Sequence, residues 1–176
     1  MKLNLGCGVT LLTGFTNVDI HYKFRKKNYV RADVRKLPFE DGSCDYILAR
    51  QVIEHIPIKD IIPTLAEWVR VLKKGGRMVV TAPNFDDFAR EWASREFDPE
   101  TYYEMAFGIY GNQLTPYEKH LTPITPKFLE FCLRGIPVQG KIKAFPKYSP
   151  MEKYPGYGED GKVYRYGEVH LDLTKI

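Results

Sequence analysis

Two glycines and an acid near the start of the chain have the types and the spacing of a nucleotide site. Gly6 and Gly8 close a short apolar-alternating run, and Asp19 closes the next one. Glycine lets backbone N–H groups approach a ligand that any Cβ would push away, and it tolerates positive φ. A carboxylate at a neighbouring strand end can accept both hydroxyls of a ribose. These residues predict a nucleotide-binding α/β unit but leave the nucleotide open.

Four further side chains are candidates for general acid–base chemistry. His55 stands where a helix is expected to begin, a place where histidines more often pack and hydrogen-bond. His120 lies in a Pro-rich segment that can reach a cleft, although ordinary surface histidines are as common there. Asp86 and Asp87 open another expected helix, where the helix dipole favours acids in any case. None of the four receives a firm catalytic assignment.

Composition sets the broad class of the protein. The chain has 176 residues, 44% hydrophobic and 27% charged, which suits one globular domain. No apolar run approaches the roughly 20 residues that cross a bilayer, and no signal peptide is visible, so we expect a cytoplasmic protein without membrane contacts. The 3 cysteines lack a CxxC pair, so neither a disulfide framework nor a metal site is expected.

The excess of positive charge lies in one stretch of the chain, which has a net charge of +4. The basic residues of this stretch are Lys23, Arg25, Lys26, Lys27, Arg31, Arg35 and Lys36. Such a stretch can be a phosphate or nucleic-acid patch. A solvated surface loop is the commoner meaning of a charge run, so nucleic acid is kept only as an alternative partner.

Hydrophobic patterning predicts the elements that must position these residues. Strands are expected at residues 2–5, 15–20, 29–34, 44–49, 77–82, 139–145 and 169–173, the last of them antiparallel and half-exposed. Helices are expected from Asp60 to a basic last turn and glycine stop at 73–76, over 85–110, and over 125–134. Only 11 positions separate Gly8 from Asp19, too few for a full crossover helix. The helices around the first three strands must therefore be abbreviated.

Taken together, these stretches resemble the class I S-adenosylmethionine (SAM)-dependent methyltransferases, above all small predicted ones that open with L-N-L-G-x-G. The resemblance rests on residues 3–8, 14–20, 32–43, 45–56, 74–76 and 82–84. Among them, residues 51–56 are similar to the family's V-L-E-H-I segment. The resemblance covers roughly residues 2–145. It implies a Rossmann-like α/β methyltransferase fold with a mostly parallel twisted sheet, an antiparallel final strand, and SAM as cofactor.

The resemblance implies an adenosine side of the site built from four residues. Asp19 would accept the ribose hydroxyls, and Ile20 would pack on the adenine. Asp33 would receive the adenine amino group, and Val34 would offer its backbone N–H to the ring. All four stand where parallel strands are expected to end, which is where open α/β sheets place their ligands.

The methionine side follows from the same resemblance. Gly6, Cys7 and Gly8 would lie under the methionine part and the ribose of SAM. Ala49 and Arg50, which leave the fourth expected strand, would line the methionine part. No metal ligand is implied.

Two departures from the family pattern bear on this site. Thr10 stands where many class I enzymes have a third glycine, and the early helices are missing or very short. The pocket is then sparsely walled, so something else must complete it. The aromatic back third of the chain or a second copy of the chain, in a homo-oligomer, would serve.

The back of the chain has its own composition. Residues 85–135 are helical and aromatic and resemble an insertion that forms the acceptor side, although sheet packing explains part of its aromatic content. Residues 146–176 comprise a Pro-, Gly- and Tyr-rich loop and the final strand, and 154–166 is the best candidate for a mobile or partner-contacting segment. No linker divides the chain, so residues 1–176 are expected to be a single SAM-binding domain.

Three functions remain open at this point. We favour a SAM-dependent methyltransferase that acts on a small molecule or a glycan precursor, with an RNA methyltransferase as a variant supported only by the basic stretch. A non-catalytic SAM-binding module that acts by interaction is the second reading. An NAD-dependent oxidoreductase is disfavoured, because G-x-G-x-x-G is absent and Asp19 follows Gly6 by 13 positions instead of about 20.

Overall fold

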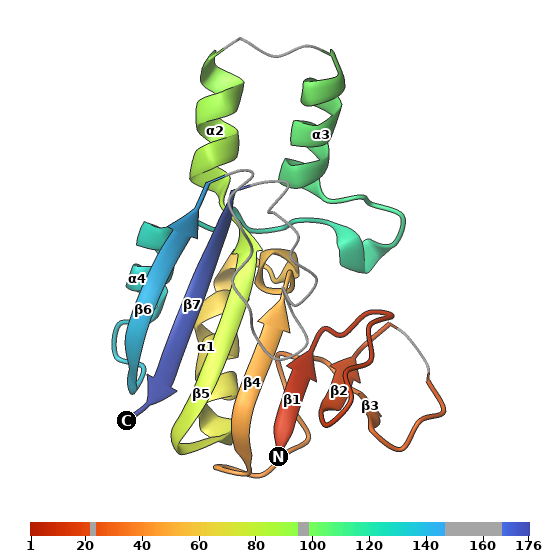
Figure 1. Ribbon diagram of the computed structural model, residues 1–176, viewed down its shortest axis with the longest axis vertical. Helices are drawn as coiled ribbons and strands as arrows, with labels where there is room; N and C mark the ends of the chain where they lie inside the picture. The colour runs from red at the N-terminus through yellow and green to blue at the C-terminus, as the bar shows by residue number, and fades with distance from the viewer. Residues whose placement is uncertain (22–23, 95–98, 147–166) are drawn as a thin grey trace.

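The computed structural model of the protein describes residues 1–21, 24–94, 99–146 and 167–176, and within them one sheet has seven strands in the order β3-β2-β1-β4-β5-β7-β6 (Figure 1). The strands are β1 (Lys2–Leu5), β2 (Thr16–Asp19), β3 (Tyr29–Arg31), β4 (Cys44–Arg50), β5 (Leu72–Pro83), β6 (Val138–Phe145) and β7 (Glu168–Lys175). The α-helices are α1 (Ile61–Val71), α2 (Phe85–Ser94), α3 (Pro99–Tyr110) and α4 (Pro126–Cys132). Single 3₁₀ turns are η1 (Ile53–His55), η2 (Ile58–Asp60) and η3 (Pro116–Glu118).

The direction of the strands gathers the candidate residues at one edge of the sheet. Strands β3, β2, β1, β4 and β5 run parallel, and β7 lies antiparallel between β5 and β6. This arrangement confirms the predicted mostly parallel sheet with an antiparallel final strand. The carboxyl ends of β1, β2 and β4 meet, so the residues that follow these three strands become neighbours.

The early connections are as short as expected. Among the described residues between β1 and β4, none is helical. The loop at 32–42 runs along α1 instead: Trp68 donates its indole N–H to the carbonyl of Val34 over 2.9 Å, and the N–H of Leu37 donates to Glu67 over 2.7 Å. This fastened loop takes the place of a crossover helix on that face of the sheet.

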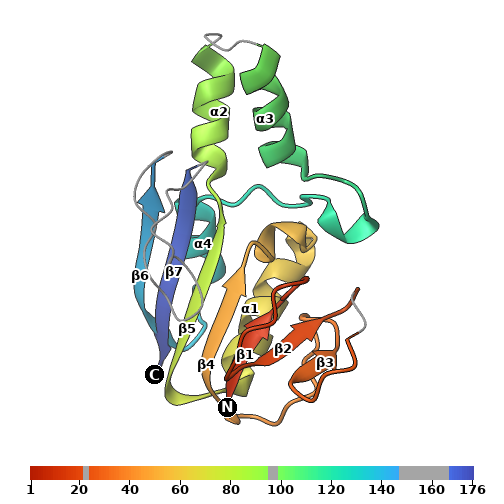
Figure 2. The same ribbon diagram turned by 45° about the vertical axis from the view of Figure 1, so that its right-hand side comes forward.

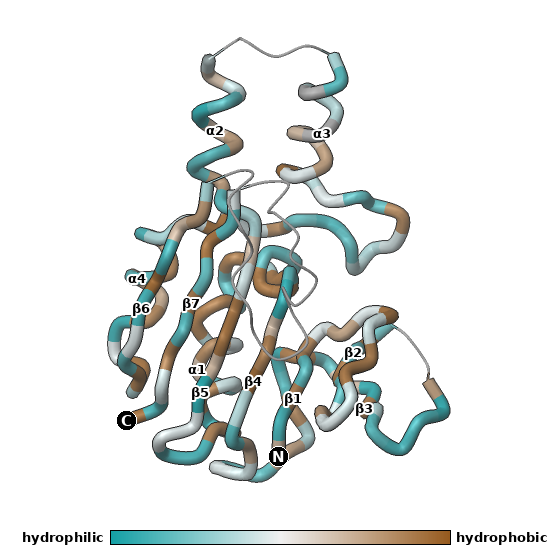
Figure 3. Tube along the Cα trace, viewed as in Figure 1, coloured by the Kyte–Doolittle hydropathy of each residue, from teal (hydrophilic) through white to brown (hydrophobic). Residues whose placement is uncertain are grey.

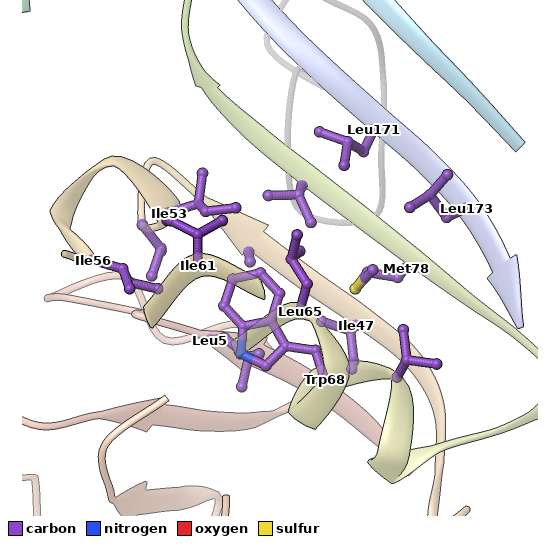
Figure 4. Close-up of a cluster of buried hydrophobic side chains, with 14 of the residues drawn as sticks. Leu5, Ile47, Ile53, Ile56, Ile61, Leu65, Trp68, Met78, Leu171 and Leu173 are labelled. Carbon is purple, nitrogen blue, oxygen red and sulfur yellow. The ribbon is translucent and has the colours of Figure 1, made fainter. Parts of the chain in front are cut away.

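The main hydrophobic core lies between the sheet and the helices α1 and α4, which cover the same face (Figures 1 and 2). Figure 4 shows its side chains, which come from α1, the turn after β4 and four strands: Leu5, Ile47, Ile53, Ile56, Ile61, Leu65, Trp68, Met78, Leu171 and Leu173. Burial of this apolar surface is the largest favourable contribution to the stability of such a fold. In Figure 3 the brown stretches of β4 and β5 mark the strands that carry much of this core, whereas α2 is largely teal.

Several predicted boundaries were wrong. Helix α1 ends at Val71, and residues 73–76 belong to β5, because Leu72 already pairs with Cys44 and the ladder begins as soon as the helix stops. Strand β3 stops at Arg31, since the backbone turns at Asp33, whose carbonyl accepts the N–H of Lys36.

The region 85–110, expected to be helical, holds two described helices, α2 and α3, which project beyond the carboxyl edge of the sheet (Figure 1). One other prediction needs correction. The last strand is not half-exposed: Val169, Leu171 and Leu173 are buried, because β7 lies inside the sheet and β6 forms its edge.

The expected loop at 146–161 and the expected partner-contacting stretch at 154–166 lie almost wholly outside the described residues. Within the described part of the chain, no helix combines the length and the apolar character that a bilayer crossing requires.

Candidate active site

A cleft of about 380 Å³ lies beyond the carboxyl ends of β1, β2 and β4. It is lined by residues from five stretches of the chain: Gly6, Gly8, Asp19–His21, Asp33–Arg35, Gln51, Val52, His55–Pro57, Thr115–Glu118 and Leu121. Small-molecule and cofactor sites in proteins span roughly 300–1,000 Å³. The cleft therefore has the size of a cofactor site and stands where this class of sheet places ligands.

The glycine turn after β1 forms one end of the cleft. Gly6 and Gly8 have φ of 58° and 52°, a region that residues with a Cβ rarely adopt. A Cβ on Gly6 would also stand 2.4 Å from Cγ2 of Val52. Gly6 thus lets the turn after β1 and the turn after β4 approach each other. The N–H of Gly8 donates to Oδ2 of Asp19 over 2.9 Å.

Asp19 is a buried carboxylate that two backbone amides orient. Only 9% of the residue is exposed. Besides the bond from Gly8, its Oδ1 accepts the N–H of His21 over 2.8 Å. These two amides fix the orientation of the carboxylate beside the cleft.

Asp33 is the second acid of the cleft, and Arg35 holds it. Arg35 donates from Nε and Nη2 to both oxygens over 2.7–3.1 Å, and its own N–H donates to Oδ1. These hydrogen bonds from Arg35 keep the pKa of Asp33 below its ordinary value. Arg35 also bonds to Asp60 over 3.1 Å, which ties this corner of the cleft to the start of α1.

The structure brings six of the nine expected cofactor residues together in the cleft: Gly6, Gly8, Asp19, Ile20, Asp33 and Val34. The other three do not line it. Cys7 and Arg50 line a separate hollow of about 20 Å³, and Ala49 is fully buried in β4. Burial, followed by the charge of Asp19, raises the pKa of the Cys7 thiol to about 12, so this thiol is not ionised at neutral pH.

The two histidines expected as bases lie together. Their rings are 4.9 Å apart between centroids, in an edge-to-face arrangement. His55 lines the cleft, whereas His120 does not. Asp86 and Asp87 do not line it either; the N–H of Asp86 donates to Asn84, whose side-chain amide donates to Asp87, so both belong to the start of α2.

Sequence reasoning missed two polar residues of the turn after β4. Gln51 lines the cleft with a φ of 54°, an uncommon conformation for a residue other than glycine. Glu54 is only 2% exposed, and neither of its carboxyl oxygens has a hydrogen-bond partner in the described part of the chain. Burial raises its pKa to about 8. The sequence signal for Glu54 was its place between Ile53 and Ile56, because an acid in an otherwise apolar turn is a candidate for a buried functional group.

Comparison with known proteins agrees with this geometry. Residues 3–80 match the family model described as a methyltransferase domain. A SAM-dependent methyltransferase of Methanosarcina mazei superposes with a TM-score of 0.65 at 15% identity, over 99% of this chain and 92% of that one. The plantazolicin methyltransferase BpumL, in complex with a desmethylPZN analogue and SAH, gives a TM-score of 0.61 at 16% identity, over 99% and 76% of the two chains.

The matches to curated sequences cover smaller parts of the two proteins. Phosphoethanolamine N-methyltransferase 2 of Caenorhabditis elegans is 27% identical over 139 residues, which is 74% of this chain and 31% of that protein. The chain spans less than half the length of the curated relatives it matches.

These findings show what the chain is similar to. Residues 3–80 match a methyltransferase domain, and the chain as a whole has the fold of solved SAM-dependent methyltransferases. The residues present fit SAM, the cofactor of those methyltransferases. The glycine turn leaves room where a Cβ would collide, and Asp19 presents oriented acceptor oxygens to the cleft.

Proposed function

We propose that this protein transfers a methyl group from SAM to a small-molecule acceptor, with a glycan precursor included in that class. The observation that carries the proposal is the cleft itself, which joins the glycine turn and Asp19 at one end to His55 at the other. A volume of about 380 Å³ suits a cofactor with a small acceptor group beside it.

The adenosine part of the cofactor is assigned to the Asp19 end of the cleft. Asp19 accepts the ribose hydroxyls, because its two oxygens are already aimed by backbone amides. Ile20 offers apolar surface to the base. Asp33 accepts the adenine amino group while it remains bonded to Arg35, and Val34 donates its N–H to the ring.

The methionine part is assigned to the glycine turn. Gly6 and Gly8 lie against it from within the cleft. Cys7, Ala49 and Arg50 support this end from outside the cleft, Cys7 and Arg50 from the adjoining small hollow. Their part is to shape the turn and the end of β4.

SAM supplies a methyl group that its sulfonium already activates, so the protein's tasks are to align the acceptor and to exclude water. Thr115–Glu118 and Leu121 line the cleft and are suited to both tasks. The acceptor side is therefore assigned to this segment, which belongs to the region 85–135 that was expected to form it. Among the described residues, the aromatic helices α2 and α3 of the same region contribute none to the cleft lining.

His55 is the proposed general base where the acceptor is a hydroxyl. It lines the cleft, and burial lowers its pKa, so the ring is neutral at neutral pH and has a lone pair for a proton. Its Nδ1 lies 3.0 Å from the carbonyl of Lys119, which orients the ring. His120 and Asp86, which do not line the cleft, have at most a supporting part.

The deciding experiment is calorimetric titration with SAM, SAH and NAD. We expect heat with SAM and SAH and none with NAD; the opposite pattern would overturn the assignment. A panel of small hydroxyl and amine acceptors, glycan precursors and a short RNA then identifies the acceptor class. Binding of SAM without transfer to any of them would favour a non-catalytic module, and transfer to RNA alone would favour the nucleic-acid variant.

A further inference from the structure

Glu54, His55 and His120 form a cluster beside the cleft, which His55 lines. None of the three is assigned to binding of the cofactor. One ligand atom of each side chain lies within 4.8 Å of those of the other two. A carboxylate and two imidazoles are a donor set that divalent first-row transition metals accept.

The carboxyl group of Glu54 is buried without a hydrogen-bond partner among the described residues. The residue is 2% exposed, and in the described part of the chain the partner is missing for both oxygens. A buried polar group without a partner is costly, and native structures retain such groups at sites that bind something. A metal ion would satisfy one or both oxygens.

The hydrogen bonds of the two histidines prepare their other nitrogens to bind a metal. Nδ1 of His55 lies 3.0 Å from the carbonyl of Lys119, and Nδ1 of His120 lies 2.7 Å from the carbonyl of Gly108. A carbonyl oxygen only accepts, so each Nδ1 carries the proton and each Nε2 keeps its lone pair. Metal-ligating histidines are commonly oriented by a carbonyl in this way. Burial lowers the pKa of both rings, and neutral imidazole is the form that binds metals.

Backbone hydrogen bonds fasten the two segments that carry the cluster. The N–H groups of Leu121 and Thr122 donate to the carbonyl of Glu54 over 2.7 and 3.1 Å. The hydroxyl of Thr122 donates to the carbonyl of Ile56 over 2.6 Å. The segment of His120 is thus held against η1 independently of any ligand. Sites held in this way lose little freedom when an ion binds.

We propose that Glu54, His55 and His120 bind one divalent first-row transition-metal ion at the wall of the cleft. Tetrahedral Zn²⁺ sites have ligand atoms about 3.4 Å apart, given metal–ligand distances of about 2.1 Å, so the side chains close on the ion by about 1 Å. Three protein ligands leave a coordination position for water or substrate. Because His55 also lines the cleft, that position would hold an acceptor oxygen, a role that rests on the proposed function. The ion would then occupy Nε2 of His55 and would itself lower the pKa of the acceptor oxygen, in place of proton abstraction by His55.

Cysteine spacing carries no signal of this site, since its ligands are a carboxylate and two histidines that the fold brings together. The test uses the full chain without a polyhistidine tag, stripped with a chelator and dialysed. Zn²⁺ is titrated by calorimetry and Co²⁺ by visible absorption, which reports the geometry around the ion. We expect one ion per chain, with Mg²⁺ unable to compete at equal concentration because it prefers oxygen ligands.

Variants locate the ion. His120→Gln and Glu54→Gln should each weaken Zn²⁺ binding by about 100-fold or more, given that loss of an outer-shell partner alone costs 10–100-fold. His21→Ala is the matched control, since His21 lines the same cleft but stands outside the cluster, and it should keep the stoichiometry and the affinity. Circular dichroism selects the variants that fold, so His120→Gln still decides the matter if Glu54→Gln does not fold.

The outcomes separate the metal site from the proposed function. No ion bound to the folded wild type, or unchanged affinity in folded His120→Gln, would overturn the metal site. Titration of the metal-free protein with SAM is a separate readout. Metal binding without SAM binding would leave the site standing and remove the proposed function, and SAM binding without metal binding would do the reverse.

Discussion

Two buried carboxyl groups, Asp19 at the end of β2 and Glu54 in the turn after β4, belong to strands on either side of β1 and differ in their surroundings. Asp19 is 9% exposed, and its oxygens accept backbone N–H groups from Gly8 and His21. Glu54 is 2% exposed, and in the described part of the chain its oxygens have no partner. The two carboxyl groups are similarly buried but differ in their hydrogen-bond partners. Burial without a donor favours the neutral form of a carboxyl group, which is the situation of Glu54.

This contrast separates two regions, the Asp19 region, which lines the cleft, and the Glu54 region, which meets the cleft through His55. In the Asp19 region backbone amides orient the carboxylate, which suits the hydroxyls of a bound cofactor. In the Glu54 region the carboxyl oxygens lack a partner among the described residues, which suits a positively charged ligand. Gly6 joins the two regions, because a Cβ on it would meet Val52, two positions before Glu54. Substitutions at these positions test whether the two regions are separate in function.

The largest effect is expected from Asp19→Ala. It removes both acceptor oxygens for the ribose, and lost hydrogen bonds to a charged group cost about 1.5–3 kcal/mol each. We expect SAM affinity to fall by about 100-fold or more in calorimetry, while Zn²⁺ affinity stays unchanged. Asp86→Ala, an exposed acid away from the cleft, is the control. Unchanged SAM affinity in Asp19→Ala would mean that the ribose contact is misplaced.

Gly6→Ala should have the second largest effect, because the added Cβ would collide with Val52 in the turn after β4. The added Cβ would stand 2.4 Å from Val52 in a backbone with φ of 58°. We expect the free energy of unfolding to fall by about 2–4 kcal/mol, from strain of about 1–3 kcal/mol plus displaced packing. Gly14→Ala is the matched control: its φ is 79°, but a Cβ there meets nothing within 4 Å. Equal losses in the two variants would show that contact with Val52 is unimportant.

A pH series distinguishes the two carboxyl groups directly. Burial raises the pKa of Glu54 from 4.5 to about 8. Between pH 4.5 and 8 the Glu54 carboxyl group therefore keeps its proton in the folded protein and loses it in the unfolded chain. The contribution of Glu54 to the stability of the metal-free wild type should then be full below pH 4.5 and fall as the pH rises towards 8. The slope from this group is at most about 1.4 kcal/mol per pH unit.

Glu54→Gln removes that slope while it retains the shape of the side chain. The difference in unfolding free energy between the two proteins, from chemical denaturation in chelator, should therefore shift in favour of Glu54→Gln between pH 5 and 8. His55 and His120, whose pKa values are lowered, contribute a loss of stability at acid pH to both proteins, so their part cancels in the difference. A flat difference would mean that Glu54 is charged and has found a partner.

The sequence predicted the cofactor residues around Asp19 far better than the cluster around Glu54. Glycines with positive φ and an acid after the next strand are local signals, and the strand order that joins them follows from parallel pairing. The cluster of Glu54 with His120 depends instead on hydrogen bonds between segments distant in the sequence, such as Leu121 to Glu54. No local pattern carries that information. The predicted end of α1 failed for a similar reason, since Leu72 was drawn into β5 by its pairing with Cys44.

The smallest effect is expected at Asp33, a third carboxyl group with intermediate surroundings. Its side chain is 31% exposed and is held by Arg35, which is itself 45% exposed. Exposed ion pairs contribute about 0–1 kcal/mol, so Arg35→Gln should barely change stability. SAM affinity should fall by only about 3- to 10-fold, because Asp33 loses its fixed orientation but keeps its oxygens. Arg90→Gln, which breaks the exposed pair with Asp87 away from the cleft, controls for the loss of one positive charge. A loss of affinity as large as that of Asp19→Ala would show that Arg35 itself holds the cofactor.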